Sequence, residues 1–336
     1  MTLKKNLSIE SVRFIAAFAV ICIHYYYTKG NSLLIVNQMA RFAVPFFFVV
    51  SGFFLAEKLK KKDTPIVYWN YFKKVLILYI AWQLIYFINP PHGEIYIRGF
   101  WKAYSNKLHS VIDLRWDYII FRGWAQHLWF FFSLGLTVIY FFFFKLKRVY
   151  LMVVIAFILY IIGALTKAYA KSSIGIPVES LGFPKKFNTN NLIFFSALPF
   201  SLGVLFSVKS IRVALVPAIL ILIIGYALHF TEVWYLGQIK LKQRIDYGFS
   251  TFLMGLGAFL VARNQFKPLE FKYIANLGKF SLGIYAMHIL VAGYLYEFIF
   301  VHFKPYPTII FCLAILVGST LVTFILSKIP GLKKIV

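Results

Sequence analysis

An arginine and a histidine stand in the first apolar segment of the chain, VRFIAAFAVICIHYYYTKG, at positions 13 and 24. Charged and titratable side chains inside an apolar segment are costly, so they indicate a function or a buried partner. In a helix, His24 lies within about 20° of Arg13 around the axis and roughly 16 Å further along it. The same face carries Ala17 and Val20 between them, and both are modest in size. This face therefore presents a cation, a shallow apolar groove and an imidazole.

Such a face suits a long, thin ligand with an anionic head and a reactive tip. Acyl-coenzyme A has this shape, with phosphates at one end and a thioester at the other. Arg13 would hold phosphate, and a neutral His24 would act as a general base or as a nucleophile that forms an acyl-imidazole. The alternative is that Arg13 reaches a lipid phosphate and His24 is hydrogen-bonded at a helix interface.

The second apolar segment, RFAVPFFFVVSGFF, begins with another arginine, Arg41. Pro45 lacks the N–H that the carbonyl of Arg41 would accept, and Ser51-Gly52 allows close backbone approach. If the first two segments form a hairpin, Arg41 and His24 lie at similar depth. Arg41 would then hold an oxyanion or a substrate hydroxyl, with lipid anchoring as the alternative.

Two later segments also carry polar side chains. His127 begins the segment HLWFFFSLG and is expected at the outer membrane surface, where a histidine beside a tryptophan is typical of an interfacial anchor. Ser281, Tyr285 and His288 recur at i, i+4 and i+7, which predicts one polar stripe on a helix. Inward-facing polar stripes commonly line cavities, so we expect this helix to pack against the first two.

Composition indicates the class of protein that must position these residues. Of 336 residues, 61% are hydrophobic and only 14% charged, which is far from the average soluble domain. We predict an all-α integral membrane protein with one domain, residues 1–336. Stretches long enough to cross a bilayer are expected at about 8–28, 38–57, 69–88, 127–144, 150–168, 191–208, 211–229, 247–263, 280–300 and 306–328.

The charge is strongly basic, +25, from 36 Lys and Arg against 11 Asp and Glu. The basic residues form short clusters at both chain ends and after the second, fourth, sixth and eighth segments. The positive-inside rule then predicts that both termini are cytoplasmic. We expect the partner of this charge to be the lipid bilayer and not nucleic acid, because no recognition motif accompanies it. Cys22 and Cys312 are predicted to be small buried hydrophobes.

The sequence resembles the membrane-bound acyltransferase family 3. The features that match are the Arg-(ten residues)-His pair, RFAVPFFFVVSGFF, HLWFFFSLG, NLIFFSALPFSLG and SLGIYAMHILV, in that order over most of the length. The resemblance is greatest to the short O-acetyltransferases that act on bacterial surface polysaccharides. One departure is YFKKVLILY, where Lys73 and Lys74 stand in a segment that is often arginine-rich. Lysines keep the charge but lose bidentate phosphate geometry.

The resemblance implies a multi-pass O-acyltransferase of the bacterial cytoplasmic (inner) membrane. It would take an acyl group, usually acetyl, from cytoplasmic acyl-CoA and pass it to a hydroxyl of a cell-surface or lipid-linked sugar. Acetyl-CoA would be a substrate, with no permanently bound cofactor and no metal. His24 matches the essential histidine and Arg13 its paired arginine, Lys73 and Lys74 fall in the donor-binding segment, and further motif positions are Arg41, Ser51, His127, Tyr285 and His288.

Two other classes of function fit the composition. A carrier or flippase for lipid-linked saccharides would also need about ten spans and aromatic walls. The other alternative is a non-catalytic membrane scaffold. The spacing of Arg13 and His24 favours the enzyme, because a flippase needs no histidine at a fixed distance from a phosphate site.

Overall fold

The structure is a computed structural model that describes residues 6–25, 31–89, 105, 109, 125–183, 188–239, 245–303 and 306–336. All regular elements in these ranges are helical, which confirms the predicted all-α class. The predicted apolar segments correspond in order to α1 (Leu7–Tyr25), α3 (Ala43–Lys61), α4 (Pro65–Ile88), α7 (Trp129–Phe144), α8 (Val149–Lys167), α9 (Ile193–Val208), α10 (Leu215–Gln238), α11 (Thr251–Arg263), α13 (Ser281–Phe298) and α14 (Thr308–Leu326).

Eight helices in the described ranges are long and apolar enough to cross a membrane, and α9 and α11 are shorter. Helices of 16 and 13 residues span only about 24 and 20 Å, less than the roughly 30 Å of hydrocarbon. Both are mostly buried, since they pack against α3, α8 and α10. Other helices therefore shield their ends from lipid.

Helix α10 continues to Gln238, nine residues past the predicted end at 229. Polar residues at and beyond the predicted end are paired inside the protein. His229 is fully buried, and Glu232 accepts hydrogen bonds from the hydroxyls of Tyr169 and Ser250. Because these partners satisfy the polar groups, the helix does not need to end in water.

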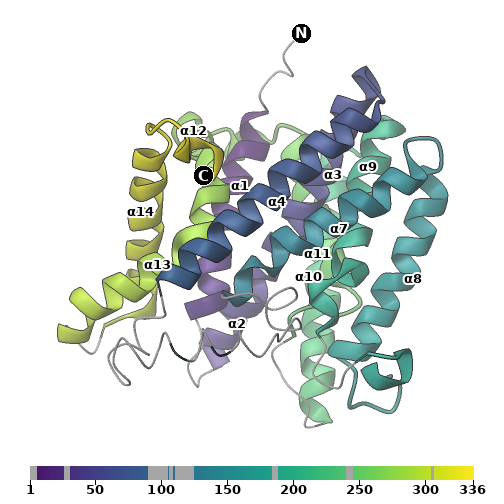
Figure 1. Ribbon diagram of the computed structural model, residues 1–336. Coiled ribbons are helices and arrows are strands. Elements are labelled where there is room, and N and C mark those ends of the chain that lie inside the picture. Colours follow the sequence, from purple (N-terminus) through teal and green to yellow (C-terminus); the bar gives the residue numbers. More distant parts are fainter. Residues whose placement is uncertain are drawn as a thin grey trace.

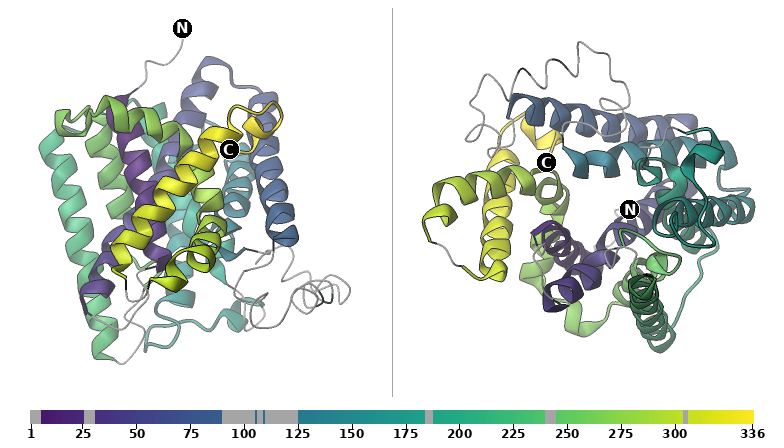
Figure 2. Two further views of the ribbon diagram at one scale, coloured as in Figure 1. Left: turned by 90° about the vertical axis from the view of Figure 1, so that its left-hand side faces the viewer. Right: turned by 90° about the horizontal axis from the view of Figure 1, so that it is seen from below.

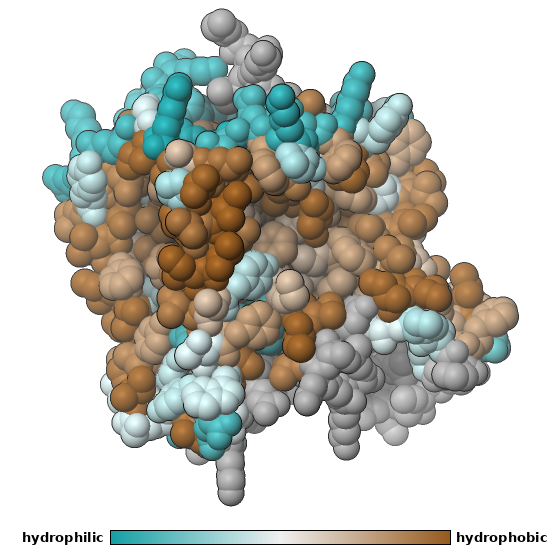
Figure 3. Space-filling model, turned by 180° about the vertical axis from the view of Figure 1, so that it is seen from behind, coloured by the Kyte–Doolittle hydropathy of each residue, from teal (hydrophilic) through white to brown (hydrophobic). Residues whose placement is uncertain are grey.

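The first helix begins, and the chain ends, on the same side of the bundle (Figure 1). The connections at 62–64, 145–148, 209–214 and 264–271 lie on this side too, and we call it the basic end. Hydrophilic residues gather there above a broad apolar belt (Figure 3). Several apolar helices and this belt make the chain a multi-pass membrane protein. The start of α1 and the end of the chain thus share a side, and it stays a prediction of the positive-inside rule that this side is cytoplasmic.

Helix α3 runs through the middle of the bundle and packs against α9, α11 and α1. Its approach to α9 depends on two glycines. A Cβ on Gly52 would overlap the carbonyl of Phe200, and one on Gly203 would overlap the carbonyl of Val49. The backbones therefore meet closely at Ser51-Gly52, as small residues in membrane helices permit.

The start of α3 is set by Pro45. Residues 34–61 form one nearly continuous span, made of α2 (Asn31–Met39), the short 3₁₀ helix η1 (Ala40–Phe42) and α3. The missing N–H of Pro45 leaves the carbonyl of Arg41 without its usual helical partner. The α geometry gives way to the tighter helix at this position, where Arg41 lies. Helices α4 and α7 lie side by side across one face of the bundle (Figure 2).

Candidate active site

Among the described residues, two cavities inside the bundle share Tyr285 in their lining. The arginine cavity, about 170 Å³, lies nearer the basic end and is lined by Arg13, Ser51, Tyr71, Lys74, Ser281 and Tyr285, among others. The histidine cavity, about 130 Å³, lies nearer the opposite end and is lined by His24, Arg41, His127, Asn190, Asp246 and Tyr285, among others. Except for Lys73 and His288, the predicted site residues thus fall into two groups that meet at one side chain.

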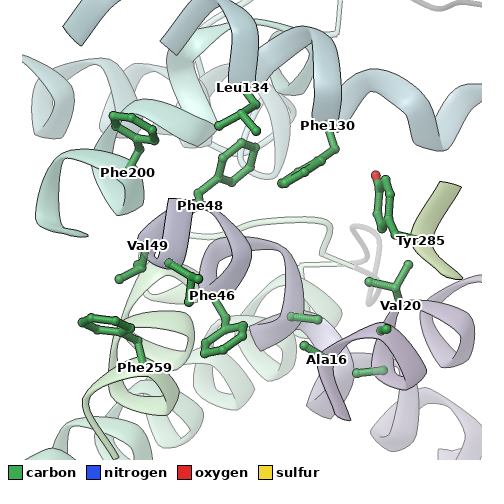
Figure 4. Close-up of a cluster of buried hydrophobic side chains, with 14 of the residues drawn as sticks. Ala16, Val20, Phe46, Phe48, Val49, Phe130, Leu134, Phe200, Phe259 and Tyr285 are labelled. Atoms are coloured by element: carbon green, nitrogen blue, oxygen red, sulfur yellow. The ribbon is translucent and has the colours of Figure 1, made fainter. Parts of the chain in front are cut away.

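One helix connects the two cavities. Arg13 is in the first half of α1 and His24 is its penultimate residue, so the same helix places a cation in one cavity and an imidazole in the other. The groove expected between them is filled. Ala17 is fully buried, and the Tyr285 ring packs 5.1 Å from Phe130 between the cavities (Figure 4). Tyr285 therefore forms the wall that separates them.

The arginine cavity contains two cations. Arg13 Nη1 lies 3.1 Å from both carboxylate oxygens of Glu10, one turn earlier on α1. A guanidinium has five N–H donors, so donors remain for a ligand. Lys74 of α4 reaches the same cavity, and Ser281 Oγ is buried without a hydrogen-bond partner.

Lys73 does not lie in this cavity. Its ammonium group lies 5.6 Å from the centre of the Trp69 ring. Neighbouring residues on a helix point about 100° apart, so Lys73 and Lys74 face different surroundings. Both lysines were predicted to bind the donor. Of the two, only Lys74 lines the cavity.

Three histidine rings cluster beside the second cavity. The His24 ring centre lies 5.1 Å from that of His288 and 6.2 Å from that of His127, and the latter two are 4.9 Å apart. In the ranges that the structure describes, no three His, Cys, Asp or Glu side chains are arranged to hold a metal ion. Neither ring nitrogen of His24 has a hydrogen-bond partner among the described residues, so His24 is available to a ligand.

The expected surface position of His127 is wrong. Its side chain is buried, and Nε2 donates to the carbonyl of Ala286 at 3.0 Å. The hydroxyl of Tyr285 donates to the carbonyl of His127. Histidine is tolerated at this depth because its polar groups are paired with α13.

His288 lies behind His24 and lines neither cavity. It is fully buried, and its Nδ1 donates to the carbonyl of Tyr285 at 2.7 Å. Its Nε2 has no partner among the described residues. The predicted polar stripe on α13 therefore divides: Ser281 and Tyr285 line a cavity, whereas His288 contacts the catalytic candidate His24 from within the protein.

Tyr86 of α4 holds this part of α13, and the sequence analysis did not identify it. The Tyr86 hydroxyl donates to the carbonyl of Ala286 at 2.9 Å and accepts from the amide of Leu290 at 3.3 Å. These two backbone groups are four residues apart, the spacing of an α-helical hydrogen bond, so the Tyr86 hydroxyl contacts both ends of one helical turn. His288 lies within that turn.

Arg41 is held by a buried asparagine that the sequence analysis also did not identify. Asn37 Oδ1 accepts from Arg41 Nη2 at 2.9 Å, and Asn37 Nδ2 donates to the carbonyl of Ile23 at 2.7 Å. Asn37 is 1% exposed. It therefore fixes the guanidinium relative to the turn of α1 that carries His24.

Further hydrogen bonds extend this contact deep into the bundle. Gln38 Nε2 donates to Asn37 Oδ1 at 3.0 Å, and Gln38 Oε1 lies 3.0 Å from His229 Nε2. The Thr251 hydroxyl lies 3.3 Å from His229 Nδ1, and the amide of Gly248 donates to Thr251 at 2.7 Å. The donation runs in one direction, from Gly248 through Thr251, His229 and Gln38 to Asn37. This consistent orientation favours cooperative strengthening of the hydrogen bonds.

Charged side chains form the rim of the histidine cavity. Arg41 Nη1 pairs with Asp246 at 3.2 Å, and the other oxygen of Asp246 lies 3.4 Å from Lys167 Nζ. Lys167 also donates to Asn188 Oδ1 at 2.6 Å. One carboxylate thus joins two cations from different helices, and it fixes the connections at 188–190 and 245–250 around the cavity.

Comparison with known proteins identifies a family. A family model described as an acyltransferase domain matches residues 6–328. A curated relative from Enterococcus faecalis, named amino-acid racemase, is 32% identical over 208 residues. These are 58% of this chain and 27% of the relative, so the match spans about a quarter of the relative's length. No solved structure matches the chain.

Proposed function

The chain belongs to this acyltransferase family, and we propose that it is a membrane O-acyltransferase that moves an acyl group, in particular acetyl, from acyl-CoA to a sugar hydroxyl. The sugar would be part of a cell-surface or lipid-linked glycan, and the membrane a bacterial cytoplasmic membrane. The observation that supports this best is the meeting of a cationic cavity and a histidine cavity at Tyr285.

The donor enters from the basic end in this proposal. Arg13 and Lys74 contact its phosphates, and the thin arm passes the aromatic side chains that line the arginine cavity. The Tyr285 side chain moves aside, so that the thioester reaches the histidine cavity. Because α1 spans both cavities, one ligand then contacts Arg13 near its head and His24 near its tip.

The acceptor enters the histidine cavity from the opposite end. His24, as a neutral imidazole, takes the proton of the acceptor hydroxyl, whose oxygen attacks the thioester carbonyl. The tetrahedral intermediate then collapses, the C–S bond breaks, and the CoA sulfur receives the proton from His24. Arg41 lies beside this reaction and holds either the developing oxyanion or an acceptor hydroxyl.

His288 orients His24 in this mechanism. Its Nε2 is a buried acceptor without a partner, and its ring is 5.1 Å from the His24 ring. A small rotation of His24 lets one of its nitrogens donate to His288, which leaves the other nitrogen free as the base. The name of the racemase relative lends no support to racemisation here, because most of that protein lies outside the match.

The test compares His24→Gln with a matched surface change, His302→Gln. We expect cells that lack the protein to lose O-acyl groups from their surface glycans, measured by NMR. The unmodified protein and His302→Gln should restore them, and His24→Gln should fall short by about a hundredfold in rate, as expected for a missing general base. Purified His24→Gln in lipid nanodiscs should still bind acetyl-CoA, measured by calorimetry.

Three outcomes would contradict the proposal. Full restoration by His24→Gln would remove His24 from the chemistry. Unchanged acylation in cells that lack the protein would exclude the proposed reaction in those cells. If the purified unmodified protein binds no acyl-CoA, a carrier for lipid-linked saccharides becomes the better explanation.

A further inference from the structure

We propose that the histidine cavity binds one sugar ring of the acceptor, and that Asn190 and Arg41 together hold a hydroxyl next to the one that reacts. The identification of this sugar as the acceptor rests on the proposed function, whereas the binding site itself is inferred from the side chains. Asn190 itself was not identified from the sequence.

Two buried polar groups in the wall of this cavity have no hydrogen-bond partner among the described residues. One is Asn190 Oδ1, on a side chain that is 5% exposed, and the other is Arg41 Nε. Both residues line the histidine cavity. Unpaired buried polar groups are costly and uncommon in native proteins, so these two indicate a ligand that pairs with them.

The two unpaired groups have opposite requirements. Asn190 Oδ1 needs a donor, whereas Arg41 Nε–H needs an acceptor. A carboxylate or phosphate would satisfy the arginine, but its oxygens would face the amide oxygen of Asn190 with the same charge sign. A hydroxyl donates and accepts at once, so it satisfies both. The chemistry of the pair therefore favours a polyhydroxylated ligand over an anion.

The rest of the Arg41 guanidinium is already occupied. Nη1 pairs with Asp246 and Nη2 donates to Asn37. These contacts hold Arg41 in place and leave Nε–H as the group without any partner. Since His24 lines the same cavity, a ring held at Nε presents a neighbouring hydroxyl to the imidazole. Arg41 thereby acts on the acceptor by direct contact, while its charge still favours the oxyanion.

An aromatic ring completes the cavity. Trp129 lines it, and its ring is braced by Phe195 at 5.9 Å and by Phe48 at 6.2 Å. A sugar ring has one face rich in C–H groups, which packs against an aromatic face, while its hydroxyls point to the sides. Trp129 and the polar pair Asn190 and Arg41 offer both kinds of contact in one cavity.

The size of the cavity limits what enters it. Its volume is about 130 Å³, whereas sites for drug-sized ligands occupy roughly 300–1,000 Å³. The cavity is therefore closer in size to one sugar ring than to an oligosaccharide. A longer glycan would therefore place a single residue inside and leave the rest beyond the rim formed by Asp246, Lys167 and Asn188.

The experiment measures binding directly, without any need for acyl transfer. The purified protein in lipid nanodiscs is mixed with methyl α-glucopyranoside, methyl α-galactopyranoside or methyl α-mannopyranoside, and saturation-transfer NMR reports the contact. We expect at least one glycoside to bind the unmodified protein. Asn190→Leu should weaken that binding about tenfold, because it removes the acceptor and leaves an apolar group against the hydroxyl.

Two further variants make the result specific. Asn190→Asp keeps an acceptor oxygen of the same shape and should bind within a few-fold of the unmodified protein. Asn264→Leu, at the basic end, removes a similar amide that bonds the carbonyls of Val213 and Leu260, and should bind normally. The inference is overturned if no glycoside binds, if Asn190→Leu binds as well as the unmodified protein, or if inorganic phosphate binds and displaces the glycoside.

Failure of this inference can be told apart from failure of the proposed function. If glycoside binding depends on Asn190 but cells that lack the protein keep all their O-acyl groups, the sugar site stands and the acyltransferase proposal fails. If Asn190→Leu restores glycan acylation completely at limiting acceptor, the acyltransferase proposal stands and the sugar site is wrong.

Discussion

The two cavities differ in how far along the chain their partners lie. In the arginine cavity, Arg13 pairs with Glu10, three residues away on the same helix. In the histidine cavity, Arg41 pairs with Asp246, which is 205 residues away, and His127 with Ala286, which is 159 residues away. The ion pair of the arginine cavity thus lies within one helix, whereas these contacts of the histidine cavity join distant parts of the bundle.

This difference agrees with the ligands that we propose. The side chain of Arg13 is a quarter exposed and Lys74 is exposed, so both can adjust to a flexible, highly charged donor. Asn37, Gln38 and His229 are at most 1% exposed, and all are hydrogen-bonded. A rigid wall suits the end where atoms react, because catalysis depends on positions held to a fraction of an ångström.

The largest effect on the donor end is expected from Arg13→Gln. Hydrogen bonds to a charged group contribute about 1.5–3 kcal/mol, or roughly a ten- to hundredfold change in affinity. We therefore expect acetyl-CoA to bind ten- to a hundredfold more weakly, measured by calorimetry in nanodiscs. Turnover should recover in large part at high donor concentration, since the histidine cavity is intact.

Arg148→Gln is the matched control, because Arg148 lies at the basic end on the turn before α8. It should bind the donor normally. If both variants weaken binding equally, general attraction by the basic end would explain the affinity, and the arginine cavity would lose its assigned role.

A smaller effect, now on the other cavity, is expected from Asn37→Leu. Without Asn37, Arg41 loses its contact to the turn of α1 that carries His24. We expect turnover to fall about tenfold with little change in acetyl-CoA affinity, because the arginine cavity lies nearer the other end. Asn37→Asp keeps an oxygen for Arg41 and should retain most of the turnover. A loss of donor affinity equal to the loss of turnover would mean that the two cavities are not independent.

The sequence predicted the helical segments because apolar length is a local property. All ten segments correspond to helices in order, although α10 is longer than predicted. Its extension depends on Glu232 being paired with Ser250 and Tyr169. That pairing is tertiary, so no local pattern indicates it.

The dependence on tertiary contacts also explains which site residues could be predicted from the sequence. The Arg13 and His24 spacing could be derived from one helix. His127 was misplaced because its acceptor is the carbonyl of Ala286 on a distant helix. Asn37 and Gln38 left a signal, two amides inside the apolar stretch LLIVNQMARF, next to an arginine already singled out. Asp246 left none, because a single carboxylate between segments has no partner until the chain folds.

The smallest effect distinguishes two adjacent lysines and sharpens the description of the arginine cavity. Lys74 lines the cavity, whereas the Lys73 ammonium group lies over the Trp69 ring. Contacts of exposed charges are typically worth about 0.2–1 kcal/mol, or up to roughly fivefold in affinity. We therefore expect Lys74→Gln to weaken acetyl-CoA binding two- to fivefold at low salt and less at high salt. Lys73→Gln should leave it unchanged.

The two variants have the same net charge, so any difference between them reports contact and not overall attraction. Equal weakening by both would mean that the donor phosphates lie outside the cavity, on the surface of the basic end.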